Sequence, residues 1–153
     1  MASPRMSDDE IWSFVRDGHT GIFTTLRRDG MPIAMPMWYC CLGQEIFMQT
    51  RGRKLQRIAH DPRASFLVET GIRWGDLVAV HMTGTAHAVD PDEELSSAFA
   101  AEMDRKYRQF RADEREMSAE TAEYYQRVMR GLVRFVPEGR ILNWDNAKMR
   151  PEA

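Results

Sequence analysis

Apolar residues change their spacing several times along this chain of 153 residues. Between residues 21 and 50 they gather in short runs rich in β-branched, aromatic and sulfur-bearing side chains, with Asp29-Gly30 between two of the runs. Such runs favour β-strands, and Asp-Gly is the strongest short signal for a hairpin. The pattern predicts three strands here and four more later in the chain, over residues 21–27, 32–41, 46–50, 64–69, 76–88, 132–136 and 140–144.

Helical spacing marks the segments around these strands. Ser7-Asp8-Asp9-Glu10 is a capping-box pattern in front of a short helix over residues 8–17, and a second short helix is predicted over residues 53–59. Asp90-Pro91 supplies a cap and a first residue for a longer helix, and a last helix follows over residues 119–130. One apolar stripe runs along the longer helix through Leu95, Phe99, Met103, Tyr107 and Phe110.

The order of these elements predicts the fold class. Six or seven short strands in mostly hairpin order, with helices at the ends and a helical insertion at about 90–130, indicate a small antiparallel barrel of the α+β class. The length suits a single domain over residues 1–153. The glycine-rich nucleotide motifs GxGxxG and GxxxxGK[ST] are missing, which argues against a doubly wound sheet.

Positive charge is concentrated in the segment TRGRKLQRIAHDPR, residues 50–63, although the net charge of the chain is −2. Arginine and lysine beside glycine suit a phosphate, because guanidinium binds two oxygens at once and glycine lets backbone N–H groups come close. The plain alternative is a solvated helix face. The negative net charge and the lack of a second aligned basic patch argue against nucleic acid as a partner.

Other features narrow the class of protein. No apolar run approaches the ~20 residues that a membrane-spanning helix needs, and the N-terminus has no apolar stretch of the kind found in signal peptides. We therefore expect a cytoplasmic protein without a membrane partner. Cys40 and Cys41 are neighbours that a strand would point to opposite faces, so we expect them to be packing residues. The four histidines are scattered without zinc-ligand spacing.

Five short pieces of the sequence, taken in order, resemble the split-barrel flavin-binding proteins related to pyridoxamine 5'-phosphate oxidase. The resemblance covers roughly residues 7–144, and no single piece is specific by itself. The pieces are Thr25-Leu26-Arg27-Arg28-Asp29-Gly30-Met31-Pro32, Pro36-Met37-Trp38-Tyr39, Thr50-Arg51-Gly52-Arg53-Lys54, Asp61-Pro62-Arg63 and Thr83-Gly84-Thr85-Ala86. The resemblance implies a split β-barrel of six or seven strands, and a homodimer with a flavin-type cofactor in each groove between the subunits.

The same resemblance implies which residues form the cofactor site. Arg53 and Lys54 match the pair that holds the cofactor phosphate, Gln49 and Thr50 match the neighbouring polar contacts, and a strand near residues 78–82 of the partner subunit would close the groove. The isoalloxazine ring would lie along four residues, largely against their backbone groups. They are Met35, Pro36, Met37 and Trp38. From the residues alone, core packing is an equal explanation for Met37 and Trp38.

Departures from the family pattern bear on the substrate and the cofactor. Val78 and Ala79 are apolar where pyridoxamine 5'-phosphate oxidase proper carries polar flavin contacts, so we expect a different substrate. Trp144-Asp145 with Lys148 is more similar to an actinobacterial branch in which many members use the deazaflavin coenzyme F420 instead of FMN. Both cofactors share the phosphate-bearing arm, whereas the anionic tail of coenzyme F420 would suit extra cations such as Arg51 and Arg57.

Three hypotheses follow. The first is an oxidoreductase that uses FMN or coenzyme F420 to transfer hydride to or from a small conjugated or heteroaromatic substrate; the cofactor supplies the chemistry, and no catalytic residue can be named. The second is a non-catalytic flavin-binding or storage protein. The third is a haem-binding split barrel with His60 or His81 as axial ligand. His81 is also on the strand expected near the ring, while Tyr124 and Tyr125 would either cap the substrate pocket or pack between helices.

Overall fold

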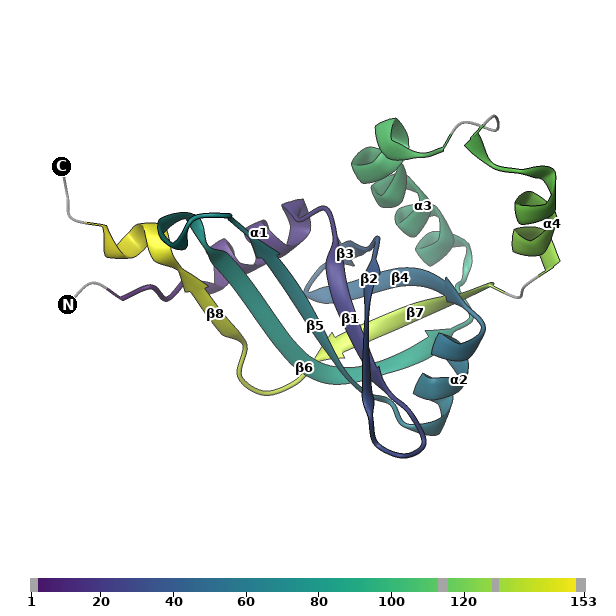
Figure 1. The fold of residues 1–153 in the computed structure, drawn as a ribbon, viewed down its shortest axis with the longest axis horizontal. Helices are drawn as coiled ribbons and strands as arrows, with labels where there is room; N and C mark the ends of the chain where they lie inside the picture. Colours follow the sequence, from purple (N-terminus) through teal and green to yellow (C-terminus); the bar gives the residue numbers. More distant parts are fainter. Residues whose placement is uncertain (1–2, 113–115, 128–129, 151–153) are drawn as a thin grey trace.

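Strand β6 (Val78–Val89) is the longest strand of the protein and pairs with three others, all antiparallel. Strand β5 (Arg63–Thr70) follows one of its edges, while β8 (Leu142–Asp145) and β7 (Arg130–Pro137) share the other edge. The computed structural model describes residues 3–112, 116–127 and 130–150. The sheet around β6 curls strongly, as Figure 1 shows.

The remaining strands extend this sheet in the order β2-β1-β5-β6-β7-β4-β3. They are β1 (Gly21–Leu26), β2 (Pro32–Met37), β3 (Cys40–Leu42) and β4 (Glu45–Arg51). Within the described residues, the two ends of the order, β2 and β3, are not paired with each other. The barrel is therefore split along this line, and the predicted α+β split barrel is confirmed.

One strand of the prediction is divided in the structure. The segment over residues 32–41 forms β2 at one end of the sheet and β3 at the other, which brings the number of strands to eight. Trp38 and Tyr39 make the crossing between the two ends. The division follows from the interior position of Tyr39, whose side chain is fully buried and whose backbone bonds to a helix instead of to a neighbouring strand.

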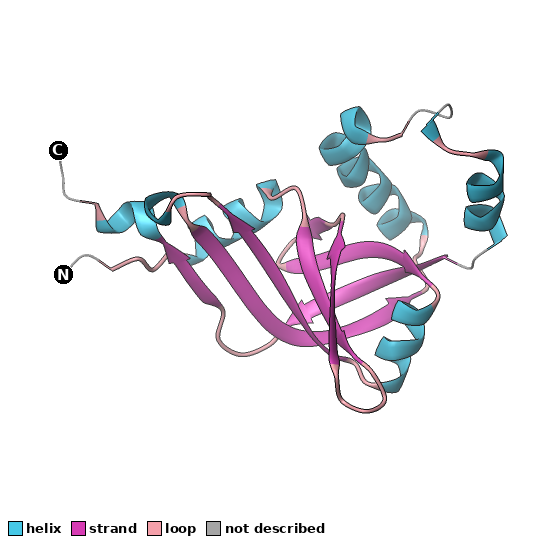
Figure 2. Ribbon diagram, viewed as in Figure 1, coloured by secondary structure: helices cyan, strands magenta, loops and turns pink. Residues whose placement is uncertain are grey.

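Helices flank the curled sheet, as Figure 2 shows. Helix α1 (Asp8–Asp17) begins with the predicted capping box, and α2 (Arg53–His60) follows β4; both add side chains to the core inside the barrel. Helices α3 (Glu93–Tyr107) and α4 (Ala119–Arg127) form the insertion between β6 and β7. Short 3-10 turns follow β5, α3 and β8; they are η1 (Trp74–Asp76), η2 (Arg108–Phe110) and η4 (Asn146–Met149). No helix in the described part of the chain is long and apolar enough to cross a membrane.

The start of α3 differs from the prediction. The cap is Asp92, whose Oδ1 atom accepts a hydrogen bond of 2.8 Å from the backbone N–H of Leu95. The predicted cap Asp90 and Pro91 lie before the helix. Both aspartates precede apolar residues at helical spacing, so the sequence pattern fits either start; the contact of Leu95 with the sheet selects the later one. For the last helix, residues 128–129 of the predicted range lie outside the described residues.

The sheet buries apolar side chains on both of its sides. Alternate residues of β4 point in opposite directions, so that Ile46 and Met48 lie in the core inside the barrel and Phe47 lies outside it. The same alternation separates the adjacent cysteines, with Cys41 inside and Cys40 outside. The outer cluster exists because three residues of the predicted α3 stripe cover it, namely Leu95, Phe99 and Met103.

The hydroxyl group of Tyr107 fastens the end of α3 to the barrel. It accepts a hydrogen bond of 3.0 Å from the backbone N–H of Tyr39, and the carbonyl oxygens of Tyr39 and His19 lie at 2.9 and 2.8 Å from it. Burial raises the pKa of Tyr107 to about 12, so the hydroxyl keeps the proton that it donates to these oxygens. One buried side chain of the insertion thus holds both the strand crossing and the loop before β1.

We expect Tyr107→Phe to lower the free energy of unfolding by about 1–3 kcal/mol, because the buried N–H of Tyr39 and the two carbonyl groups lose their partner. The ring of phenylalanine keeps the apolar contacts. Urea denaturation followed by circular dichroism measures the change. Tyr124→Phe is the matched control, since Tyr124 is exposed and should tolerate the loss of its hydroxyl group. Equal stabilities of the two variants would contradict the role of the Tyr107 hydroxyl.

The two thiol groups should be unreactive in the folded protein. Burial raises the pKa of Cys40 to about 12 and that of Cys41 to about 11, which leaves almost no thiolate at neutral pH. We expect neither thiol to react with iodoacetamide at about pH 8, where an ordinary cysteine reacts, and both to react once urea unfolds the chain. Mass spectrometry after timed labelling gives the result, and fast alkylation of either thiol in the native protein would show that it is accessible.

Candidate functional site

The basic segment lies at the junction of β4 and α2, as the sequence predicts. The two elements are joined by Gly52, which has a φ of 59° and a ψ of −126°, a conformation that glycine adopts easily and other residues rarely do. Gly52 is also the cap of α2 and offers no side chain to the first N–H groups of the helix. These N–H groups therefore face outward beside the first two side chains of the helix, Arg53 and Lys54.

The cations of α2 lie close enough to repel one another. Burial and the charge of Arg57 lower the pKa of Lys54, and burial and the charge of Arg53 lower the pKa of Arg57. In the part of the chain that the structure describes, no carboxylate forms a salt bridge with any of the three. Arg57 is held in place by its Nε atom, which donates a 2.7 Å hydrogen bond to the hydroxyl of Thr25 on β1. A bound anion would relieve this repulsion.

A hollow of ≈ 340 Å³ lies between α2 and the hairpin that joins β1 to β2. Positively charged and polar side chains form most of its wall, which consists of Leu26, Arg27, Arg28, Arg53, Gln56, Arg57 and His60. The hairpin residues of this wall were not predicted as site residues, because only the folded chain brings residues 26–28 against α2. Arg27 is also paired with Asp29, two residues further along the hairpin turn.

Strand alternation separates the other basic-segment residues from this hollow. Thr50 points inward and is only 4% exposed, whereas Gln49 and Arg51 lie on the opposite side of β4. Arg51 turns toward α4, where it donates a 3.1 Å hydrogen bond to the carbonyl oxygen of Tyr125 and lies 4.0 Å above the centroid of the Tyr125 ring. The structure thus joins Arg53 and Arg57 in one hollow and directs Arg51 to the insertion.

Residues 35–38 lie along the edge of the split. Met35 and Pro36 are exposed on β2, whose second edge is not paired in the described residues, so that its backbone groups are free to bind a flat ring. Met37 points into the core and is 9% exposed, as the packing alternative predicts. Trp38 is 37% exposed and stacks on Tyr107, with ring centroids 4.5 Å apart and planes inclined by 7°.

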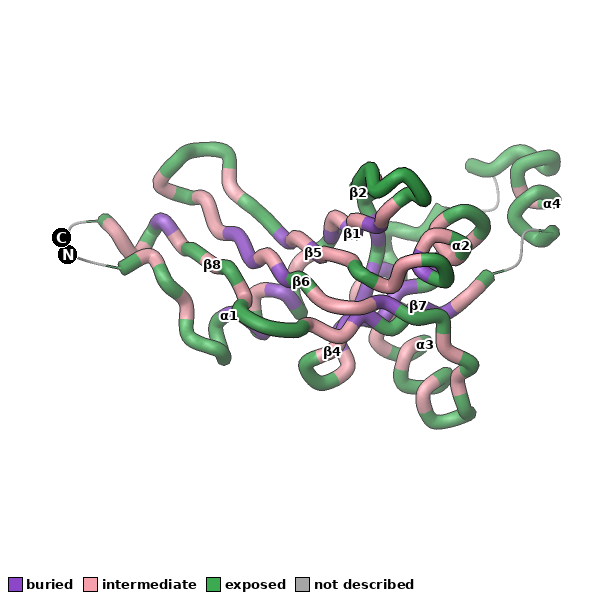
Figure 3. Tube along the Cα trace, turned by 90° about the horizontal axis from the view of Figure 1, so that it is seen from below, coloured by how far each residue is buried: buried purple, intermediate pink, exposed green. Residues whose placement is uncertain are grey.

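The structure places a histidine next to Trp38 that the sequence did not single out. His19, in the loop between α1 and β1, meets the Trp38 ring edge to face with centroids 5.9 Å apart. The histidine expected near the ring, His81, lies on β6 opposite Leu67 and Leu142. Tyr124 and Tyr125 lie on α4, which buries none of its described residues, as Figure 3 shows along this helix. His19 lies in a loop, where the sequence has neither helical nor strand periodicity, so no such pattern could have identified it.

Comparison with known proteins agrees with the fold. The family model described as pyridoxamine 5'-phosphate oxidase matches residues 7–138. The chain is similar to the solved structure of the conserved hypothetical protein Rv2991 from Mycobacterium tuberculosis, with 29% identity and a TM-score of 0.79 over 100% of this chain and 94% of the other. No curated protein matches the sequence.

Two other solved structures share the fold at lower identity and differ from each other in function. An F420 reductase has 17% identity and a TM-score of 0.58, with 85% of this chain and 94% of the other covered. HutZ, the haem storage protein of Vibrio cholerae, has 16% identity and a TM-score of 0.64, with 88% and 92% covered. The family model spans most of the chain, and the curled, split sheet is the one that these proteins share. The chain belongs to the pyridoxamine 5'-phosphate oxidase family of split barrels.

Proposed function

We propose that this protein is an oxidoreductase that binds FMN or coenzyme F420 and transfers hydride between this cofactor and a small conjugated or heteroaromatic substrate. One observation carries the proposal: three cations of α2, Arg53, Lys54 and Arg57, lie close together, so that burial and the neighbouring charge lower the pKa of Lys54 and Arg57, and they have no carboxylate partner in the described residues. Such a group needs an anion, and phosphate is the anion that a helix start and paired cations bind best.

In this proposal each part of the site has a separate task. Arg53 and Lys54 hold the phosphate, and the free edge of β2 supports the flat ring through the backbone of residues 35–38. The bound cofactor supplies the hydride chemistry. The protein orients the ring and keeps water away from one of its faces. The substrate differs from pyridoxamine 5'-phosphate, because Val78 and Ala79 offer no polar side chains on the strand where that enzyme has them.

The choice between the two cofactors depends on the hollow beside α2. FMN ends at the phosphate, whereas coenzyme F420 continues into an anionic tail. Arg27, Arg28 and Arg57 line the hollow next to Arg53 and would attract that tail. Arg51, which the sequence also suggested for this purpose, is engaged by α4. The proposal therefore includes both cofactors and gives the hollow as the feature that would favour coenzyme F420.

A homodimer is part of the proposal. The outer side of β3 and β4 is covered by α3, but the outer side of β2, β1, β5, β6 and β8, here called the open face, has no such cover in the described residues. One cross-strand row on the open face is largely apolar and runs through Pro36, Ile22, Leu67, His81 and Leu142. A second copy of the chain would bury this row and bring its own β6 toward the split.

A storage protein is the second candidate, because HutZ has the same fold. His60 in the hollow and His81 on the open face are the axial ligands that a bound haem could use. A Soret band after addition of haemin would support this candidate. Turnover of the reduced flavin or deazaflavin by an added substrate would support the oxidoreductase.

Replacing both Arg53 and Lys54 by alanine should weaken cofactor binding roughly 100-fold or more, because each charge-assisted hydrogen bond contributes about 1.5–3 kcal/mol. Fluorescence titration of the purified protein with FMN and with coenzyme F420 gives the two dissociation constants. Arg5→Ala/Arg140→Ala removes the same charge from exposed positions away from α2 and should bind as the unmodified protein does. Unchanged affinity of the first variant would refute the phosphate site.

Leu67→Asp should convert the proposed dimer into a monomer, because it places a charge in the middle of the apolar row on the open face. Sedimentation equilibrium measures the mass of each form. Ala100→Asp adds the same charge to the exposed side of α3 and should remain dimeric. A monomeric unmodified protein, or a dimer that survives Leu67→Asp, would show that the open face is not the contact.

A further inference from the structure

Four aromatic side chains from three distant parts of the chain meet beside the split of the barrel. Trp38, Tyr107, Phe110 and His19 form this group, which we call the aromatic platform. Trp38 and Tyr107 stack, and the His19 ring is edge-on to all three others, with centroid distances of 5.9 Å to Trp38, 5.4 Å to Tyr107 and 4.7 Å to Phe110. Tyr107 is buried, but Trp38 is 37% and Phe110 49% exposed. Exposed aromatic surface of this kind suits a flat apolar ligand.

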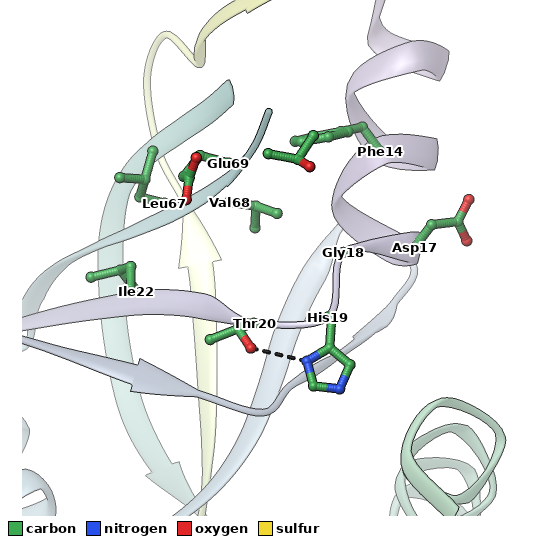
Figure 4. A pocket seen from close by; sticks show the side chains of 10 residues that line it. Phe14, Asp17, Gly18, His19, Thr20, Ile22, Leu67, Val68 and Glu69 are labelled. Atoms are coloured by element: carbon green, nitrogen blue, oxygen red, sulfur yellow. Dashed lines mark hydrogen bonds between the residues drawn. The ribbon is translucent and has the colours of Figure 1, made fainter. Parts of the chain in front are cut away.

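The imidazole of His19 is held in a defined orientation. The backbone carbonyl of His19 lies 2.8 Å from the Tyr107 hydroxyl that donates to it, and its Nδ1 atom lies 3.0 Å from the hydroxyl oxygen of Thr20. Figure 4 shows the second of these bonds and the imidazole at the end of α1. The Nε2 atom forms no hydrogen bond with any described residue. One ring nitrogen is thus used for orientation, and the other is free to exchange a proton with a ligand.

Two hollows meet at His19. One, of ≈ 430 Å³, extends along the ends of β1 and β5 and includes the apolar side chains of Phe14, Ile22 and Leu67. Ile22 and Leu67 also belong to the apolar row of the proposed dimer contact, so the partner subunit would border this hollow. The other, of ≈ 280 Å³, lies between the end of α1 and the end of α3 and includes Tyr107 and Phe110. The charged side chains that line one or both are Arg16, Asp17, Glu69, Arg105 and Lys106. The imidazole is exposed between the two hollows, so solvent can return a proton to it.

We propose that the aromatic platform binds the substrate and that His19 is a catalytic residue, the proton donor of the reduction. The proposal rests on the proposed function, in which the cofactor ring lies along residues 35–38 and so ends at Trp38. The class of substrate is a small α,β-unsaturated carbonyl compound. Its flat conjugated system stacks on Trp38 or Phe110, and its carbonyl oxygen accepts a hydrogen bond from Nε2 of His19.

The step balances with the reduced flavin or deazaflavin as reductant. Hydride from the reduced cofactor forms a new C–H bond at the β-carbon of the substrate, and the carbon–carbon π-bond breaks. The electron pair moves onto the carbonyl oxygen, and this oxygen takes the proton from Nε2 of His19 in its imidazolium form, which gives the enol. The imidazole is then neutral and regains its proton from solvent, and the enol converts to the saturated carbonyl compound. The substrate has gained one hydride and one proton, and the cofactor has lost two electrons.

The first test uses the cofactor-free protein and 2-cyclohexen-1-one as the probe. We expect the imidazole NMR signals of His19, assigned with His19→Gln, to move when the probe is added, while the signals of His87 stay in place. His87 is an exposed histidine on β6 with no described aromatic neighbour. Unmoved His19 signals at saturating probe would overturn docking on the aromatic platform.

The second test measures the oxidation of the bound, reduced cofactor by 2-cyclohexen-1-one. His19→Gln and His19→Phe should each slow the reaction about 100-fold or more, as removal of a general acid does, without changing cofactor affinity. His87→Gln should react as the unmodified protein does, and thermal melts establish that all variants fold.

A wild-type rate in His19→Gln would overturn the proton role alone. A cofactor-loaded protein that never reduces the probe would overturn the substrate class. If neither cofactor binds, the proposed function and the proton role fall together, while the NMR result still decides the docking.

Discussion

The hydroxyl group of Tyr107 is the contact on which the arrangement of the site depends. It bonds to the backbone where the chain crosses from β2 to β3, and to the carbonyl group of His19 before β1. The crossing joins the two unpaired ends of the sheet, and the His19 loop lies between α1 and β1, so neither segment is held by strand pairing. The buried hydroxyl group of Tyr107 holds both segments in place of strand pairing. It accepts one hydrogen bond and donates its proton, and so satisfies backbone groups that would otherwise be buried without partners.

The same contact shows which part of the insertion belongs to the core of the protein. Helix α3 covers the outer cluster around Phe47 and ends at Tyr107, so it belongs to the core of the protein. Helix α4 buries none of its described residues and is joined to β4 through Arg51 and Tyr125. The two helices therefore differ: α3 completes the packing of the outer cluster, whereas α4 lies on the surface. Helix α3 covers only one half of the outer surface, and the open face has no such cover in the described residues.

The candidate site combines two kinds of surface, one at each end of β2. Beside α2, Arg53 and Arg57 line a polar hollow, and burial together with the charge of Arg53 lowers the pKa of Arg57. Beside Trp38, partly exposed aromatic rings lie next to one oriented imidazole. A molecule with a phosphate at one end and a flat ring at the other fits this division, and a flat substrate fits the aromatic end. Electrostatics would hold such a cofactor, while stacking would select what reacts with it.

Local patterns in the sequence determined most of the elements and the basic end of the site. The capping box at Ser7, the Asp29-Gly30 turn and the alternation in β4 act between near neighbours, and the segment from Arg53 to Arg57 carries its charge wherever it folds. The division of residues 32–41 into two strands depended on Tyr107, 68 residues after Tyr39. The placement of His19 beside Trp38 and of Arg27 and Arg28 beside α2 likewise arose between distant segments. Periodicity records which face of an element is buried, but it holds no information about which other element covers that face. Only the tertiary structure decided these contacts between distant segments, because they follow from how the sheet curls.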